Sequence, residues 1–352
     1  MTPDAEQLAR EIVALCTGEF RFALAGICEA APSGRGDEFR AWIQSGRHGE
    51  MTWLARNVEV RLDPRAFVPG ARSLIMVADL YAERGRLRSD ERAAKVPSGE
   101  GRRRGRVARY AQGDDYHVVM KKRLHALCDR LRERFPREMF RAFVDTAPVL
   151  EREHAARAGL GWIGKHTLLI HPRLGSCMFL GGVATTLAIQ PAPEQREIAD
   201  HCGTCTRCID ACPTGAISPY SIDATRCISY LTIEHRSSIA PELRPLMGDW
   251  LFGCDICQEV CPHNGPRRDA AAADPTSADL AGDARASARA HPAYAPRPPA
   301  RDGFDLLEVL GWSEADRSRA LKRSAMKRAK LAMLQRNAKA LMESSEHRAE
   351  GE

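Results

Sequence analysis

Runs of apolar residues with two different spacings predict strands and helices in the first half of the chain. Residues Ser73–Tyr81 form a short, almost uninterrupted apolar run, which is typical of a strand buried on both faces. From His117 to Phe135 the apolar residues recur instead at helical spacing. Residues Met139–Val144 again have the pattern of a strand. The predicted apolar face of the helix consists of Val118, Leu124, Leu127, Cys128 and Leu131.

Turn and helix-start signals continue this pattern to about residue 190. Pro148 suits the first turn of a helix that runs through Glu151 and ends near Gly159 or Gly161. Two apolar segments, Thr167–Ile170 and Met178–Thr186, flank a turn that contains proline and glycine, which is typical of a pair of strands. Residues 1–190 are therefore predicted to form a mixed α/β domain.

The rest of the chain divides into three segments of different composition. Residues 191–265 contain most of the cysteines. Residues 266–303 are rich in Ala, Asp, Arg and Pro and have no apolar period, so they are predicted to form a flexible linker. Residues 304–352 return to helical spacing and form a predicted basic helical tail.

The overall composition is that of a soluble globular protein. Of the 352 residues, 44% are apolar and 28% are charged. The sequence has no apolar run long enough to span a membrane. Residues 1–10 include acids and lack the apolar segment of a secretory signal. We therefore expect a cytoplasmic protein without a membrane partner.

Twelve cysteines are many for a protein of that compartment, where disulfides are rare and metal binding is the more frequent explanation. Four of them are scattered among apolar neighbours, as small core residues are. These four are Cys16, Cys28, Cys128 and Cys177. The other eight lie within sixty residues, from Cys202 to Cys261.

The spacing of these eight cysteines predicts two [4Fe–4S] clusters. Thiolates are soft ligands that suit such clusters, and the run C-x2-C-x2-C-x3-C-P that begins at Cys202 is not a zinc spacing. In two-cluster ferredoxins, the cysteine before the proline binds the other cluster. The predicted ligands are Cys202, Cys205, Cys208 and Cys261 for the first cluster, and Cys212, Cys227, Cys254 and Cys257 for the second. The predicted fold class is therefore α+β, with a mixed α/β domain, a ferredoxin-like two-cluster module and a helical C-terminal segment.

An electron carrier would need only the two-cluster module, yet about 190 residues precede it. We therefore expect the clusters to serve a reaction in the N-terminal domain. The chain has neither a G-x-G-x-x-G motif after a strand nor a G-x-x-x-x-G-K-[ST] motif. A dinucleotide site and a nucleoside triphosphate site are therefore not predicted.

Asp145 is the candidate catalytic residue of that domain. It follows a predicted strand and precedes a predicted helix, where α/β folds place their sites. Its neighbours Phe143 and Val144 would desolvate the carboxyl group, and the raised pKa would allow it to donate a proton. The alternative is that Asp145 only caps the following helix. The residues alone favour neither interpretation.

The net charge of +6 is unevenly distributed. Basic residues are concentrated at Arg102–Arg109 and again at Arg317–Lys339. Such asymmetry is typical of proteins that bind a polyanion. For either cluster alone, a solvated helix face is the simpler explanation.

Several motifs together resemble the epoxyqueuosine reductase family, the QueG family of tRNA-modifying enzymes. The resemblance extends over most of residues 10–265 and is far more specific than the cysteines alone. The matching segments are Gly49–Leu54, Arg61–Pro64, Arg109–His117, Val144–Pro148, Gly159–Lys165, Gly175-Ser176, Arg226–Leu231 and Leu251–Cys257.

The resemblance implies an oxidoreductase that uses two [4Fe–4S] clusters and cobalamin to reduce epoxyqueuosine to queuosine at the wobble position of tRNA anticodons. It implies that Asp145 is the proton donor. It also implies a corrinoid site, whose matching positions are Arg61, Ala108, Asp145, Leu169, Leu180 and Ser229. The chain departs from the family at Cys177-Met178, where an aromatic pair is usual, and at Gly182, where an acid is common.

The expected partners follow from the same resemblance. They are a tRNA anticodon stem-loop and an external electron donor, which would be a reductase, a flavodoxin or a ferredoxin. We expect the protein itself to be a monomer. With tRNA as the substrate, an RNA-binding role of the basic tail is favoured, because contacts to phosphates contribute affinity. The predicted RNA contacts are Lys322, Arg323, Lys327, Arg328 and Lys330.

Two alternatives remain at this stage. A corrinoid-dependent reductive dehalogenase would have similar clusters, but such enzymes usually carry an export signal and a tyrosine acid, and the sequence has neither feature. A non-enzymatic two-cluster electron carrier is disfavoured by the size of the N-terminal domain and by the number of site-like residues between 49 and 185.

Overall fold

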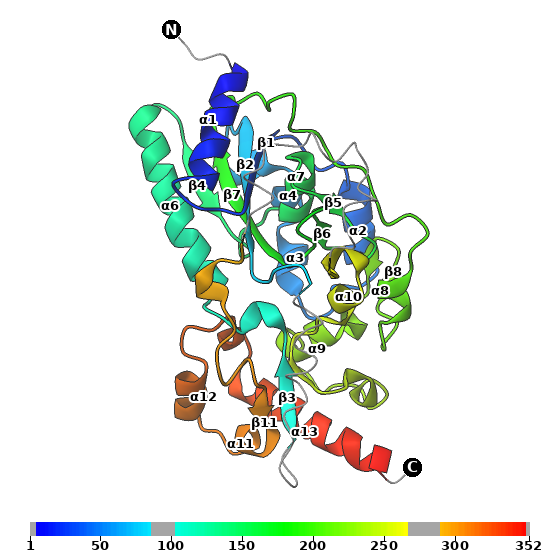
Figure 1. Ribbon diagram of the computed structural model, residues 1–352. Helices are drawn as coiled ribbons and strands as arrows, with labels where there is room; N and C mark the ends of the chain where they lie inside the picture. The colour runs from blue at the N-terminus through cyan, green and yellow to red at the C-terminus, as the bar shows by residue number, and fades with distance from the viewer. Residues whose placement is uncertain (1–4, 86–102, 267–288, 350–352) are drawn as a thin grey trace.

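The computed structural model describes residues 5–85, 103–266 and 289–349 (Figure 1). The helices are α1 (Ala5–Thr17), α2 (Gly36–Gln44), α3 (Thr52–Arg56), α4 (Val58–Leu62), α5 (Pro64–Phe67), α6 (Tyr116–Arg134), α7 (Glu151–Arg157), α8 (Arg207–Asp210), α9 (Ile228–Ile233), α10 (Ile256–Glu259), α11 (Leu306–Leu310), α12 (Glu314–Ala320) and α13 (Leu331–Ala349). The strands are β1 (Leu24–Glu29), β2 (Ser73–Leu80), β3 (Arg104–Val107), β4 (Phe140–Phe143), β5 (Trp162–Ile163), β6 (Leu169–Ile170), β7 (Met178–Thr185), β8 (Ile217–Ser218), β9 (Ser221–Ile222), β10 (Trp250–Phe252) and β11 (Phe304–Asp305). Short 3-10 helices include η2 (Arg109–Ala111), η4 (Arg244–Met247), η9 (Pro292–Tyr294) and η10 (Ala325–Arg328).

An antiparallel sheet of strand order β1-β2-β7-β4 organises the N-terminal part. Strand β2 is buried along its whole length, which confirms the strand predicted from the apolar run at Ser73. Because alternate residues of a strand point to opposite faces, Val77 packs with α1 and α6 on one face and Met76 packs with α7 on the other. Figure 1 shows α6 and α7 on either side of these strands.

The helix predicted over His117–Phe135 is α6, and its buried face consists of Met120, Leu124, Leu127, Cys128 and Leu131. The assignment of Val118 to that face was wrong, because Val118 lies in the first turn, outside the buried stripe, and is 67% exposed. The strand predicted over Met139–Val144 is β4.

Two predictions near residue 150 and residue 175 were also wrong. The helix after β4 begins at Glu151 and not at Pro148, because Asp145 has a left-handed backbone (φ +48°) and turn hydrogen bonds occupy the residues that follow. The segments predicted as a pair of strands do not pair with each other. Strand β6 pairs with β5, whereas β7 is taken up by β2 and β4 in the larger sheet.

A second sheet, of order β10-β3-β11, joins three distant parts of the sequence. Strand β3 was not predicted, because its arginines hide any apolar pattern. The side chain of Arg106 lies over the Trp250 ring, 4.1 Å from its centroid, and pairs with Glu259 at 2.9 Å. Much of the first basic cluster is therefore used inside the fold. Arg102 lies outside the described residues.

Helix α13 packs against β10 and η4, so the C-terminal helices share a core with the cysteine module. The described part of the predicted linker, residues 289–303, is packed as well. Tyr294 is 1% exposed and its hydroxyl donates to Asp79 Oδ2 at 2.9 Å. A flexible linker is therefore wrong for residues 289–303, and residues 267–288 lie outside the described part of the chain.

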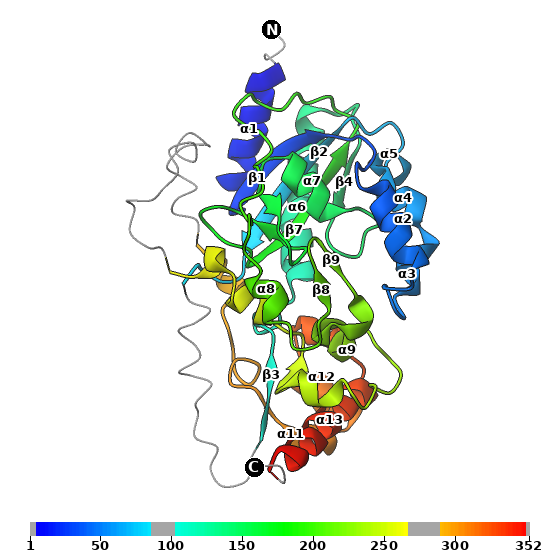
Figure 2. The same cartoon turned by 90° about the vertical axis from the view of Figure 1, so that its right-hand side faces the viewer.

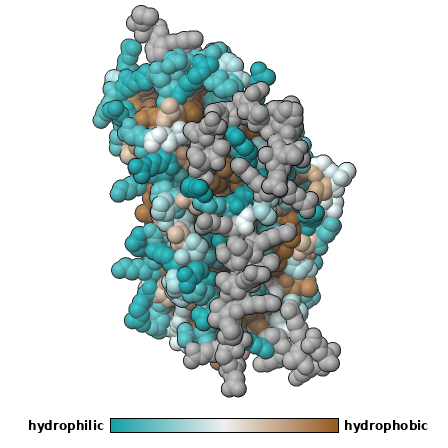
Figure 3. All heavy atoms as spheres, in the orientation of Figure 1, coloured by the Kyte–Doolittle hydropathy of each residue, from teal (hydrophilic) through white to brown (hydrophobic). Residues whose placement is uncertain are grey.

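Figure 2 shows α8, β8 and β9 between the larger sheet and the part that contains β3, α11 and α13. On the face seen in Figure 3, hydrophilic side chains predominate along the edge that α6 and α12 form, and the visible hydrophobic residues lie in smaller groups. No helix within the described ranges is both long enough and apolar enough to cross a membrane. The antiparallel larger sheet, the mixed second sheet and the separate helices agree with the predicted α+β class.

Candidate active site

Asp145 stands directly after β4, next to the first turn of α6. Its Oδ2 atom lies 2.9 Å from His117 Nε2, and its side chain is 56% exposed. The other ring nitrogen of His117 lies 2.8 Å from Asp115 Oδ1. Asp115 also caps α6 by accepting a hydrogen bond from the His117 backbone N–H. The helix start therefore holds His117 between two carboxylates.

The proton of this group resides on the histidine. Burial alone would lower the pKa of His117, but the hydrogen bonds and charges of Asp115 and Asp145 raise it to about 9. Burial raises the pKa of Asp145, yet the hydrogen bond and charge of His117 outweigh this effect and hold the pKa below its usual value. The raised pKa predicted for Asp145 is therefore wrong for this conformation, because a protonated histidine lies beside it.

A second carboxyl group lies close enough to Asp145 to interact with it electrostatically. Burial, and then the charge of Asp145, raise the pKa of Glu151 to about 8. Glu151 Oε1 and Arg61 Nε are both buried and lack a hydrogen-bond partner within the described ranges. Buried polar atoms without partners are rare. They leave one donor and one acceptor of this site without a partner among the described residues.

The positions expected to contact a corrinoid differ in accessibility. Leu180 is partly exposed and lies on β7, two residues before Gly182, which pairs with Phe143 at the end of β4. Ser229 is also partly exposed, and its backbone N–H is directed to the Cys227 thiol. Ala108 and Leu169 are only 1% and 2% exposed, so the protein itself covers them.

The eight cysteines fall into two groups in space. Cys261 packs with Cys202 and Trp162, and the nearby Cys202 and Cys208 add to the burial that raises the pKa of its thiol to about 11. Cys254 lies near both Cys227 and Cys212. Cys257 lies near Cys254 and Cys227 and also near Cys208, and the crossed ligand assignment stays a prediction. The four remaining cysteines, Cys16, Cys28, Cys128 and Cys177, are buried core residues, as predicted.

The cysteine groups do not have the arrangement of a mononuclear metal site. Across the described ranges, no three Cys, His, Asp or Glu side chains surround a single point in the way that the ligands of one metal ion do. A [4Fe–4S] cubane has an iron at each of four corners, and it therefore needs thiolates that are set farther apart. A free thiol is present at all eight positions.

Aromatic side chains connect the second cysteine group with Asp145. Tyr110 and Cys254 both pack against the small buried cluster of Ala108, Ile228 and Trp250, and the Tyr110 ring centroid is 6.3 Å from that of Tyr116. The Tyr116 ring in turn stacks on His117 with a centroid distance of 4.0 Å. The second group is therefore the one that faces the Asp145 site.

The cations predicted to contact RNA are exposed, and two of them stand near the same site. Lys327 lies close enough to Asp115 to influence its pKa, and the charge of Asp145 acts on Arg328. Arg328 lies 4.9 Å above the Trp53 ring and pairs with Glu234 at 2.7 Å. The remaining predicted contacts are Lys322, Lys330 and Arg323, of which Arg323 pairs with Asp114.

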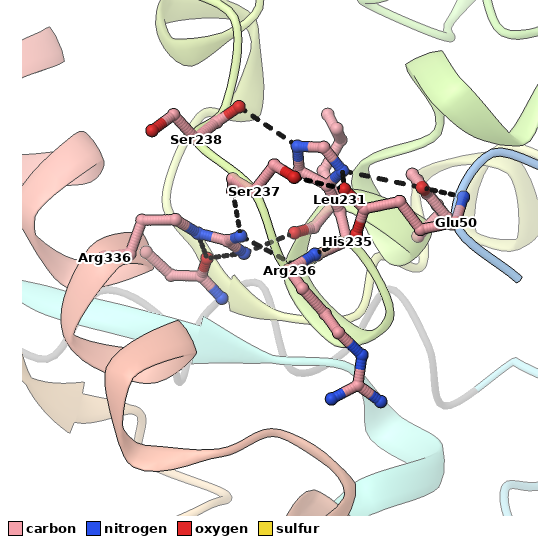
Figure 4. Close-up of polar contacts among 9 residues, drawn as sticks. Glu50, Leu231, His235, Arg236, Ser237, Ser238 and Arg336 are labelled. Carbon is pink, nitrogen blue, oxygen red and sulfur yellow. Dashed lines mark hydrogen bonds and ion pairs between the residues drawn. The ribbon is translucent and has the colours of Figure 1, made fainter.

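Other cations of the second basic cluster brace the fold. Figure 4 shows Arg336 directed at the loop after α9, where it donates to the carbonyl oxygens of His235 (2.7 Å) and Ser237 (2.6 Å). It also donates to the Leu231 carbonyl at 2.7 Å. Glu50 reaches the same loop and accepts from the Arg236 N–H and the Ser237 hydroxyl.

His117, Asp115 and Glu151 were not predicted from the sequence to have a role in the site. The spacing Asp-x-His at a helix start was the available signal for the first two, because an N-cap carboxylate lies next to the side chain two residues later. Nothing local marks Glu151, since its burial and its interaction with Asp145 arise only in the folded chain.

Comparison with known proteins gives consistent matches. Residues 61–146 match the family model described as "Epoxyqueuosine reductase QueG, DUF1730", and residues 201–264 match the "4Fe-4S double cluster binding domain". An epoxyqueuosine reductase of Pseudomonas aeruginosa is 42% identical over 265 residues, which cover 74% of this chain and 70% of that protein. The Escherichia coli epoxyqueuosine reductase is 37% identical over 326 residues, which cover 92% and 78%.

Solved structures are similar over nearly the whole chain. A crystal structure of selenomethionine-labelled epoxyqueuosine reductase aligns with a TM-score of 0.80 and 27% identity, over 96% of this chain and 82% of that one. A crystal structure of epoxyqueuosine reductase with an epoxyqueuosine-modified tRNA-Tyr stem loop aligns with a TM-score of 0.79 and 28% identity, over the same shares.

Proposed function

The chain belongs to the epoxyqueuosine reductase family, and on that premise we propose that it reduces epoxyqueuosine to queuosine at the wobble position of tRNA anticodons. The observation that carries the proposal is the placement of Asp145. It is hydrogen bonded to His117, its charge acts on Arg328, and Lys327 stands near the neighbouring Asp115. Tyr110, whose pKa is raised by burial and then by the charge of Asp145, packs on the same buried cluster as Cys254.

The residues present fit the cofactors that this reaction needs. The two cysteine groups would hold two [4Fe–4S] clusters. Arg61, Leu180 and Ser229 would contact a cobalamin next to Asp145, and the unpartnered Arg61 Nε and Glu151 Oε1 agree with a polar group bound there. When bound, these cofactors would supply single electrons in sequence and a strongly reducing cobalt centre.

Side chains of the protein would deliver the first of the protons that the reaction consumes. Converting an epoxide to an alkene consumes two electrons and two protons and releases water. We assign the first proton transfer to Asp145, which receives a proton from His117 Nε2 and passes it to the departing oxygen. Asp115 holds the opposite nitrogen of the imidazole and so keeps His117 aligned.

The exposed cations of η10 and its neighbours would bind the phosphates on either side of the modified nucleotide. We assign this role to Lys322, Arg323, Lys327, Arg328 and Lys330. Arg328 is the best placed of them, because Trp53 and Glu234 orient its guanidinium near Asp145.

The test is turnover of a defined RNA. Protein that carries both clusters and cobalamin is incubated with a strong reductant and an anticodon stem-loop that contains epoxyqueuosine. We expect mass spectrometry of the digested RNA to show queuosine. An unchanged epoxide in the presence of full cofactor loading would contradict the proposal.

Asp145→Asn is the matched variant for the assigned proton donor. It keeps the size of the side chain and a hydrogen-bonding oxygen but cannot supply the proton, so we expect turnover to fall by about 10²–10⁴-fold. Cluster and cobalamin absorbance should stay at the wild-type level. Full activity of Asp145→Asn would show that another group donates the proton, and loss of cofactors would show that Asp145 is structural.

A further inference from the structure

The two cysteine groups differ in how far they are covered by protein. Around Cys254 and Cys257 the flanking residues Gly253, Asp255 and Gln258 are buried. Around Cys202 and Cys205, by contrast, the residues between and beside the cysteines are exposed. These exposed residues are His201, Gly203, Thr204 and Thr206. The first group therefore approaches the surface, whereas the second faces the Asp145 site.

Polar contacts hold this surface in place. Lys165 Nζ donates to the carbonyl oxygens of Gly203 at 2.5 Å and Cys205 at 3.1 Å, which fixes the loop around the first cysteines. Asp200 accepts from the Cys202 N–H at 2.7 Å and from the Tyr220 hydroxyl. The Tyr220 backbone N–H donates to the Lys165 carbonyl at 3.1 Å. A surface held in this way can be recognised without first being ordered.

Cations lie beside this surface. The charge of Arg35 acts on Tyr220, and Arg47 Nη1 donates to the Ser221 hydroxyl at 3.3 Å. Both arginines are exposed and come from the start of α2 and from the turn after it. The side chain of Asp200, the acid closest to Cys202 in sequence, is engaged by Tyr220. Figure 2 shows α8, β8 and β9, which border this surface, on the side turned to the viewer.

We propose that the surface formed by Gly203, Thr204, Tyr220, Arg35 and Arg47, here called the reduction face, docks an acidic one-electron carrier protein. The cations attract an acidic partner and orient it over the exposed loop, which brings its redox centre next to the first cysteine group. Each encounter oxidises the carrier by one electron, and two encounters supply the two electrons of one turnover. The proposal rests on the clusters of the proposed function but not on its RNA substrate.

The experiment measures reduction of the protein in the absence of RNA and cobalamin. Protein that carries both clusters is mixed with reduced flavodoxin, a small acidic carrier, and bleaching of the cluster absorbance is followed by stopped flow. For Arg35→Glu/Arg47→Glu, we expect the second-order rate to fall about tenfold or more at low salt, and the difference to shrink at high salt. Dithionite, which is a small molecule, should reduce both proteins equally fast.

The matched control is Arg130→Glu/Arg137→Glu, which changes the net charge equally at the far end of α6, on the opposite side of the larger sheet. It should react with flavodoxin like the wild type. If the double reversal loses its clusters, Arg35→Gln/Arg47→Gln replaces it, and a smaller but salt-sensitive slowing is expected.

Two outcomes would overturn the proposal. One is a flavodoxin rate that Arg35→Glu/Arg47→Glu lowers no more than the control Arg130→Glu/Arg137→Glu does. The other is an unchanged flavodoxin rate together with weaker binding of an anticodon stem-loop, which would make the face an RNA surface. Because no epoxide takes part in the measurement, its failure is distinct from a failure of the proposed reductase activity.

Discussion

At the scale of single residues, the main feature is the hydrogen bond between a protonated His117 and the carboxylate of Asp145. An isolated carboxyl group in a partly buried position would be a weak acid. The histidine changes this, because its pKa rises to about 9 while that of Asp145 falls. The raised pKa favours a protonated His117 at neutral pH, next to the carboxylate of Asp145, to which we assign the proton transfer.

His117→Gln tests this charge state through the pH dependence of stability. The pKa of His117 is raised from 6.5 to about 9 in the folded protein, so protonation favours folding. This stabilisation is complete below pH 6.5 and is lost as the pH rises through about 9. We expect the difference in melting temperature between wild type and variant to be largest at pH 6 and to shrink towards pH 10.

His125→Gln is the control for that measurement. His125 lies on the same helix but is exposed. Its substitution removes an exposed imidazole of the same helix and should change the melting temperature little. A difference in melting temperature between wild type and His117→Gln that stays constant across this pH range would mean that the two carboxylates do not raise the pKa of His117.

At the scale of elements, two side chains of α13 hold α9 and the loop that follows it. Arg336 satisfies three carbonyl oxygens there, and Asn337 donates to the carbonyls of Thr232 and Leu251 at 3.0 Å. Helix α9 follows directly after Cys227 and carries Ser229. The C-terminal helix therefore positions one side of the second cysteine group, although it contributes no cysteine.

Arg336→Met tests how much the hydrogen bonds of Arg336 contribute to the free energy of unfolding. Three carbonyl oxygens lose a charged donor while the alkyl part of the side chain is kept, so we expect a loss of about 3 kcal/mol in the free energy of unfolding. Lys339→Met is the control, because Lys339 is 72% exposed and pairs only at 3.8 Å with Glu343. It should change stability by less than about 0.5 kcal/mol. Denaturant titration of both variants checks the prediction, and equal effects would contradict it.

At the scale of the whole molecule, the C-terminal segment closes around the N-terminal site. Strand β11 pairs with β3, and η10 approaches Asp115 and Asp145. The reduction face lies on the side of the larger sheet that α7 covers, next to the first cysteine group. RNA and the electron donor are thus assigned to separate surfaces, so both can be bound during one turnover.

Lys327→Glu/Arg328→Glu tests the RNA surface. Each lost phosphate contact should reduce the magnitude of the slope of log K against log salt concentration by about 1, and affinity for the anticodon stem-loop should fall most at low salt. Filter binding or fluorescence anisotropy at several salt concentrations measures both quantities. Arg130→Glu, far along α6, should leave them unchanged. An unaltered slope in the double variant would show that these residues form only a solvated surface.

Local patterns in the sequence determined a large part of this structure. The buried strand β2, the helix α6 and the cysteine spacing could be predicted because each depends on residues within a few positions of one another. The motif resemblance added the reaction and pointed to Asp145. A run of arginines hid β3, because a strand supported mainly by partners far along the chain needs little local pattern.

Only the tertiary structure decided the electrostatics of the site and the use of the basic residues. A pKa depends on neighbours in space, so the sequence could not indicate that His117 would lower that of Asp145. Equally, charge counts could not separate Arg336, which is a brace inside the fold, from Arg328, which stands exposed near the active site. Spacing along the chain determines which side chains share a turn, whereas folding determines which charges meet.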